Sequence, residues 1–217
     1  MKIKKIVLIS TLIVGLSPLC LGQNIKGSSH DFAQSKNAAY NSTGELCIVC
    51  HAPHGTDPTA VPLWNHHTTS QVFNTYIGYK FSLPGYGGST ITQPDGASKL
   101  CLSCHDGVSA MNQFGGMFQG PSGTPLPMTT NDRIGTDLTN DHPISFVYNT
   151  TLATTDGRLK DPATATTSLG GTIATDLLDI NGKVQCPSCH EVHDPTIYRF
   201  GKISNAGSAL CLTCHNK

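Results

Sequence analysis

The chain has 217 residues, and its 14 basic side chains are balanced by 14 acidic ones. Charged residues make up only 13%, about half of the usual share of roughly 25%, and no basic stretch is present that could follow a nucleic-acid backbone. Aromatic residues amount to 6%, whereas nine cysteines and ten histidines are present. We therefore expect something other than side chains to fill part of the interior.

Residues 1–22 have the features of an export signal. Lysines near the start precede an apolar run from Ile6 to Leu16, which is too short to span a bilayer. Cleavage after Gly22 leaves a mature chain without a membrane-spanning segment. Lipidation of Cys20 is the alternative, but the bulky Leu19 precedes it where a small residue is preferred. We expect an exported protein, in a compartment where thiols do not stay free.

The mature chain contains four copies of one motif, Cys-x-x-Cys-His, and these account for all of its cysteines. The motif cysteines are Cys47, Cys50, Cys101, Cys104, Cys186, Cys189, Cys211 and Cys214, and the histidines that follow them are His51, His105, His190 and His215. This is the attachment motif of haem c, in which two thiols bond to the porphyrin and the adjacent imidazole binds the iron. The motifs therefore predict four covalently bound haems with these histidines as proximal ligands.

Two other uses of paired cysteines have to be weighed against haem attachment. Four Cys-x-x-Cys pairs could form two Cys₄ zinc sites or a disulfide scaffold. Neither use requires a histidine directly after every second cysteine, and zinc ribbons are mostly intracellular. The pattern favours a tetrahaem cytochrome.

Six further histidines are candidates for the distal side of the four irons. His54 and His193 each stand three residues beyond a proximal histidine. Side chains three apart on a helical turn face the same way, so neither can bind the opposite face of its own haem and each must serve a different one. His30 and His142 stand upstream of the two Cys-x-x-Cys-His-x-x-His units and complete the predicted set of distal ligands.

Some possible ligands stay ambiguous. His66 and His67 are candidates either for iron or for a hydrogen bond to a haem propionate. Methionine ligation is the other alternative, at Met111, Met117 or Met128, but bis-histidine ligation is expected throughout.

The order of these features repeats. The first half has His30, CIVCH with APH, and then LCLSCH, while the second has His142, CPSCH with EVH, and then LCLTCH. This predicts a duplicated dihaem module, with a first module at 23–133 and a second at 134–217 in one compact tetrahaem unit.

Between the motifs the sequence predicts mostly irregular backbone. Short strands are expected at 72–76 and 144–148, loops at 79–96 and 115–130, and no apolar period of 2 or 3.6 is sustained over 150–175. Ser98 and Ser208 are expected to cap helices that carry the LCLxCH motifs, and Pro187 suits the first turn of a helix. The fold class is thus a multihaem cytochrome, with short α-helices around the motifs and few short strands.

The motif order, together with Pro62-Leu63-Trp64-Asn65-His66 and Asp141-His142-Pro143-Ile144, resembles the doubled-CXXCH cytochromes, and within them the OmcE-type outer-surface tetrahaem cytochromes of metal-respiring bacteria. The resemblance implies extracellular electron transfer and, in some members, polymerisation into haem-lined filaments in which a histidine binds a haem of the neighbouring subunit. By position that histidine is His54. The expected partners are redox proteins or an extracellular electron acceptor, and further copies of this chain.

The expected function is electron transfer without a catalytic site, because four distal histidines leave no iron with an open position. A monomeric periplasmic shuttle is one alternative to a surface filament. A reductase of small oxyanions is another, but it needs a five-coordinate haem beside basic residues, and no segment of the mature chain clusters lysine and arginine.

Overall fold

The computed structural model describes residues 25–56, 63–76, 93–119 and 123–216. The predicted export signal at 1–22, with Cys20, and most of the loop predicted at 79–96 lie outside the described residues. No helix within the described part of the chain is long and apolar enough to cross a membrane.

Short elements joined by irregular backbone make up the fold, as the sequence predicts. The longest helix is α1 (Gly96–His105). The other α-helices are α2 (Thr150–Asp156), α3 (Ile173–Asp176), α4 (Cys186–Cys189) and α5 (Ala209–Cys214), and the 3-10 turns are η1 (Ser35–Asn37), η2 (Tyr198–Phe200) and η3 (Ala206–Ser208). Strands β1 (Gln113–Phe114) and β2 (Met117–Phe118) form one antiparallel pair, and β3 (Phe146–Val147) and β4 (Lys183–Val184) form another.

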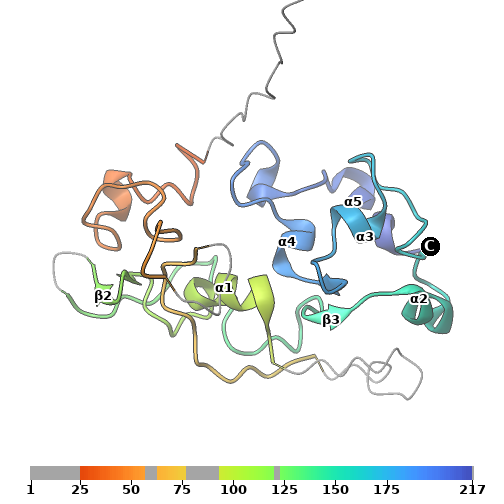
Figure 1. Ribbon diagram of the computed structural model, residues 1–217, viewed down its shortest axis with the longest axis horizontal. Helices are drawn as coiled ribbons and strands as arrows, with labels where there is room; N and C mark the ends of the chain where they lie inside the picture. Colours follow the sequence, from red (N-terminus) through yellow and green to blue (C-terminus); the bar gives the residue numbers. More distant parts are fainter. Residues whose placement is uncertain (1–24, 57–62, 77–92, 120–122, 217) are drawn as a thin grey trace, which may run out of the picture.

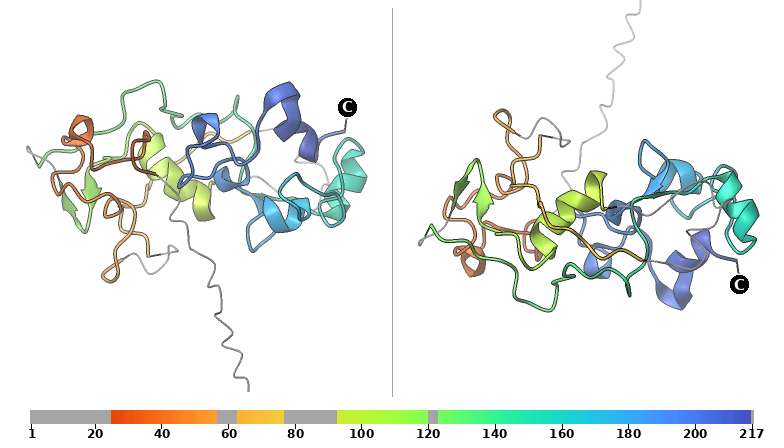
Figure 2. Two further views of the ribbon diagram at one scale, coloured as in Figure 1. Left: turned by 90° about the horizontal axis from the view of Figure 1, so that it is seen from above. Right: turned by 90° about the horizontal axis from the view of Figure 1, so that it is seen from below.

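The two halves of the chain lie side by side along the long axis, with residues 25–56 and β2 at one end and α2, α3 and α5 at the other (Figure 1, Figure 2). Helices α1 and α4 meet in the middle. Each half has its own cluster of buried apolar side chains. The first contains Phe32, Val49, Met111, Phe114 and Met128. The second contains Phe146, Tyr148, Leu152, Ala153, Ile173, Leu177, Val184 and Ile203.

Of the two strands that the sequence predicts, the structure contains one. The strand expected at 144–148 is present as β3, where it pairs with β4. The strand expected at 72–76 is wrong, because in this segment only Asn74 forms a bridge, to Asp137. The loop expected at 115–130 contains β2, because Gly115 and Gly116 both adopt positive φ and close a two-residue hairpin turn.

Helix starts are set by residues that the apolar pattern does not reveal. Ser98 is not a cap: α1 begins earlier, with Asp95 at the N-cap position, and Ser98 is completely buried in the first turn. Ser208 does precede α5, but its side chain makes no capping hydrogen bond. Pro187 lies in the first turn of α4, as predicted. The 150–175 segment, without apolar periodicity, contains α2, whose first turn is capped by Asn149.

Candidate haem sites

The same tight turn carries the motif in three of the four copies that the structure describes. In each, the histidine N–H donates to the carbonyl of the first motif cysteine: His51 to Cys47 at 2.8 Å, His190 to Cys186 at 3.1 Å and His215 to Cys211 at 3.0 Å. The remaining motif occupies the last turn and a half of α1. We number the motifs in chain order as site 1 (Cys47, Cys50, His51), site 2 (Cys101, Cys104, His105), site 3 (Cys186, Cys189, His190) and site 4 (Cys211, Cys214, His215).

In three of the four motifs, the second cysteine packs against buried apolar side chains. Burial raises the pKa of Cys50 and of Cys214 to about 11, and it raises that of Cys104 further. Cys50 and Cys104 pack against the first apolar cluster, and Cys214 packs against the second. The protonated thiols therefore stand at the edge of apolar surface, which suits bonding to the edge of a porphyrin.

Three of the four proximal histidines face one of the sequence-predicted distal histidines. The ring centroids of His51 and His193 are 6.1 Å apart. Those of His105 and His30 are 6.0 Å apart, and those of His215 and His142 are 6.4 Å apart.

This spacing is what two axial imidazoles on one iron require. Metal–imidazole bonds are about 2 Å long, and the ring radii add to them, so the centroids of two imidazoles on opposite faces of a metal lie roughly 6 Å apart. The chain thus holds three histidine pairs at the right separation, while the fourth proximal histidine, His190, has no such partner among the ten histidines, all of which are described. His54, the remaining predicted distal ligand, is exposed and also makes no ring pair.

Hydrogen bonds orient several of these rings. The Nδ1 atoms of His105, His142 and His190 lie 2.9 Å from the backbone carbonyls of Asp132, Pro143 and Arg199. A neutral imidazole that donates from Nδ1 presents its Nε2 lone pair on the other side, which is the usual arrangement of a metal-binding histidine. His190 is therefore oriented like a ligand, although its ring forms no close pair with a second histidine ring.

His66 and His67 occupy different environments from these pairs. His66 is 2% exposed, its Nδ1 lies 2.8 Å from the His67 carbonyl, and its Nε2 lies 3.2 Å from the Met111 carbonyl and 3.4 Å from Cys104 Sγ. Burial lowers the pKa of His66, so the ring is neutral, and both of its nitrogens are engaged. The side chain of His67 is exposed. Neither histidine faces a proximal ring.

The candidate methionines are also accounted for by packing. Met111 and Met128 are buried in the first apolar cluster, and Met117 is 65% exposed in β2.

The sites are neighbours in the order in which they occur in the chain. Cys50 of site 1 is close enough to Cys104 of site 2 to raise its pKa. Cys101 of site 2 and Cys186 of site 3 are close enough to shift each other's pKa, which is raised for Cys101 and lowered for Cys186. In turn, Cys211 and Cys214 of site 4 both interact electrostatically with Cys189 of site 3. The motif cysteines therefore form a continuous line from site 1 to site 4.

Sequence reasoning did not identify Trp64 as a functional residue. Backbone hydrogen bonds from Ala52 to the Leu63 carbonyl and from Asn65 to the Cys50 carbonyl hold this segment against site 1, and the indole meets the His51 ring edge-on at 6.4 Å. Its Nε1 is buried without a hydrogen-bond partner in the described part of the chain. A buried indole N–H normally has an acceptor, and the carboxylate of a haem at site 1 is of the right chemical kind to supply it.

Site 3 opens on an apolar cavity of about 190 Å³. The apolar lining includes Leu102, Leu138, Ile144 and Val184. Cys186, Cys189 and His190 of site 3, together with His142, also line it. Apolar lining beside the two thiols and the oriented imidazole fits a porphyrin face. The donor sets of the four sites thus fit haem c. In contrast, within the described ranges no group of three or more His, Cys, Asp or Glu side chains is arranged to hold a metal ion, as a Cys₄ zinc site would require.

A family model described as the doubled CXXCH motif matches residues 180–217, the segment that contains sites 3 and 4. None of the curated proteins compared with the chain matches it. The family match, the motifs and the donor geometry together support a multihaem c-type cytochrome with covalently bound haem c.

Proposed function

We propose that this multihaem cytochrome binds four haems and transfers electrons along them, without a catalytic site. When bound, the haems supply the one-electron carriers. The observation that carries the proposal is the set of three histidine pairs with centroids 6.0–6.4 Å apart. A pair of imidazoles at this separation would hold one iron between them and would leave it no position for a substrate.

The pairing follows the predicted duplication. His30 faces the second motif of the first module, and His142 faces the second motif of the second module. His193, which follows site 3, faces site 1 in the other module. By the same rule His54, which follows site 1, is the expected distal ligand of site 3. This reciprocal arrangement supports a duplicated dihaem module with boundaries at 23–133 and 134–217.

His54 and His190 do not pair within the chain. We propose that they pair between subunits, with His54 of one copy completing site 3 of the next. Each subunit then offers one unused donor and one incomplete site, so association continues head to tail and forms a filament rather than a closed dimer. Exposure of both side chains supports this arrangement. The arrangement is like that of the OmcE-type cytochromes that the sequence resembles. Together with the predicted export signal, this resemblance supports a location outside the cell.

The test compares His54→Ala with the matched control His67→Ala, because both histidines are exposed and lie in the same module. In the filament, wild type and His67→Ala should contain only low-spin haem. His54→Ala should form no fibres in electron micrographs, and one haem in four should become high-spin in the electron paramagnetic resonance spectrum. Added imidazole should restore the low-spin signal but not the fibres.

Two outcomes contradict the inter-subunit ligand. Fibres that persist in His54→Ala would show that another contact drives assembly. A wild-type monomer in which all four haems are already low-spin would show that His54 binds within its own chain, and the protein would then be a monomeric shuttle.

A further inference from the structure

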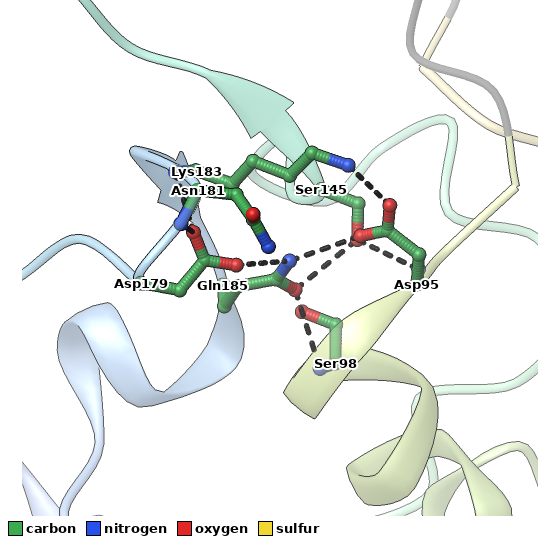
Figure 3. Close-up of polar contacts among 7 residues, drawn as sticks. All are labelled: Asp95, Ser98, Ser145, Asp179, Asn181, Lys183 and Gln185. Atoms are coloured by element: carbon green, nitrogen blue, oxygen red, sulfur yellow. Dashed lines mark hydrogen bonds and ion pairs between the residues drawn. The ribbon is translucent and has the colours of Figure 1, made fainter. Parts of the chain in front are cut away.

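The first turns of α1 and α4 are joined by one buried side chain, Gln185 (Figure 3). It is 2% exposed and directly precedes Cys186 of site 3. Its Oε1 accepts hydrogen bonds from the Ser98 N–H and the Ser145 hydroxyl, each at 3.2 Å. Its Nε2 donates to Asp95 Oδ1 at 3.0 Å and to Asp179 Oδ2 at 3.2 Å. Both amide hydrogens are thus used, and the carbonyl oxygen accepts twice.

Bonds in the opposite direction complete the network. Ser98, which is completely buried in α1, accepts the Cys186 N–H through its hydroxyl oxygen at 3.0 Å. The Asp95 carboxylate forms an ion pair with Lys183. The backbone N–H of Asp95 donates to the Ser145 hydroxyl at 3.0 Å. The two helices are therefore connected by side chains from residues about ninety positions apart.

A network of this kind resists sliding of one helix along the other. Each buried group is paired, and a displacement that breaks a bond leaves a polar atom buried without a partner, which is costly in an environment of low dielectric constant. Apolar packing alone is less directional and tolerates small shifts. The network reaches both sites directly: Gln185 precedes Cys186, the Cys186 N–H donates to the Ser98 hydroxyl, and Ser98 lies in the helix that carries Cys101.

We propose that Gln185 is a positioning residue that fixes the separation and relative orientation of the haems at sites 2 and 3. This is the point at which the line of sites crosses from the first module to the second. The inference rests on the proposed electron-transfer function, because the rate between carriers depends on their spacing. The network holds the two attachment turns in register, so the spacing does not depend on haem contacts alone.

A matched control separates positioning from general stability. Asn112 is also a completely buried side-chain amide with satisfied hydrogen bonds, to the carbonyls of Gln119 and Thr124 and from the Leu126 N–H. It lies in the first module, away from the contact between α1 and α4. Replacement of either amide by an apolar side chain of similar size removes a buried polar network.

The experiment uses the haem-loaded full chain with Gln185→Met, Ser98→Ala and the control Asn112→Leu, and measures circular dichroism in the Soret region, where coupled haems give a paired signal. Gln185→Met should reduce or reshape the coupled signal, and Ser98→Ala should do so to a smaller extent. Asn112→Leu should lower the melting temperature to a comparable degree and leave the coupled signal as in the wild type.

An unchanged Soret signal in both Gln185→Met and Ser98→Ala would overturn the proposal, as would an equal loss in Asn112→Leu. Ser98→Ala, which removes only one hydroxyl, keeps the test decisive if Gln185→Met does not mature. The signal depends on haem geometry and not on filaments or current. If the wild type forms no filament and Gln185→Met still loses the coupled Soret signal, the filament proposal is contradicted and the positioning role of Gln185 is supported.

Discussion

At the scale of single residues, the chemistry of the molecule lies in which histidines meet. The sequence spacing predicted that His193 cannot serve the iron of its own motif, and the structure places its ring beside His51 in the first half of the chain. The specific partner could not be predicted, because it depends on how the two modules pack against each other. For His66 the sequence left two roles open, as an iron ligand or as a hydrogen-bond partner of a haem propionate. Both of its ring nitrogens lie beside backbone carbonyls, so His66 differs from the paired histidines, which face another histidine ring.

Replacement of Trp64 by phenylalanine should lower the midpoint potential of one haem. Trp64→Phe keeps an aromatic ring against His51 and removes the N–H that has no acceptor in the described part of the chain. If that N–H donates to a haem carboxylate, its loss leaves the carboxylate charge less compensated, which favours the ferric iron. We expect the midpoint potential of one haem to fall by tens of millivolts, since roughly 59 mV corresponds to a tenfold change for one electron.

Redox titration of the purified variant, followed by its absorption spectrum, measures this shift. The other three haems are an internal control because they should titrate as in the wild type. Four unaltered potentials in Trp64→Phe would show that the indole N–H does not interact with the haem.

At the scale of elements, the helices are defined by local capping and not by apolar periodicity. The sequence predicted a helix at each LCLxCH motif and the position of Pro187, because these depend on short-range rules. It did not predict α2, whose signal consists of one capping side chain and a glycine at the other end: Asn149 accepts the Leu152 N–H, and Gly157 ends the helix with a φ of 70°. Cap residues are frequent in polar loops, so they become informative only once tertiary contacts are known.

Asn149→Ala should therefore destabilise this half of the molecule. Loss of the capping bond at 2.9 Å leaves the Leu152 N–H without its acceptor, at a cost of about 1 kcal/mol. Thermal unfolding of the haem-loaded protein should show a lower melting temperature, while the Soret spectrum stays as in the wild type because α2 carries no motif residue. A melting temperature equal to that of the wild type would show that water replaces the cap without cost.

At the scale of the whole molecule, three small apolar clusters and a polar network between α1 and α4 hold four attachment turns, each next to the one that follows it in the chain. The low aromatic content predicted that side chains alone would not fill the interior, and the apolar cavity beside site 3 agrees with that expectation. The order of the sites could not be predicted from the sequence, because it depends on the contact of α1 with α4, which brings Cys101 to Cys186. This contact connects the two halves of the chain.

The most direct test of the central claim is an electron density or cryo-microscopy map of the purified, haem-loaded protein that resolves the axial ligands. We predict four haems in chain order, with iron between His51 and His193, between His105 and His30, and between His215 and His142. At site 3, iron should lie between His190 and the His54 of a neighbouring subunit. A map in which any of the three internal pairs is separated, or in which an iron lacks a second protein ligand, would contradict the account.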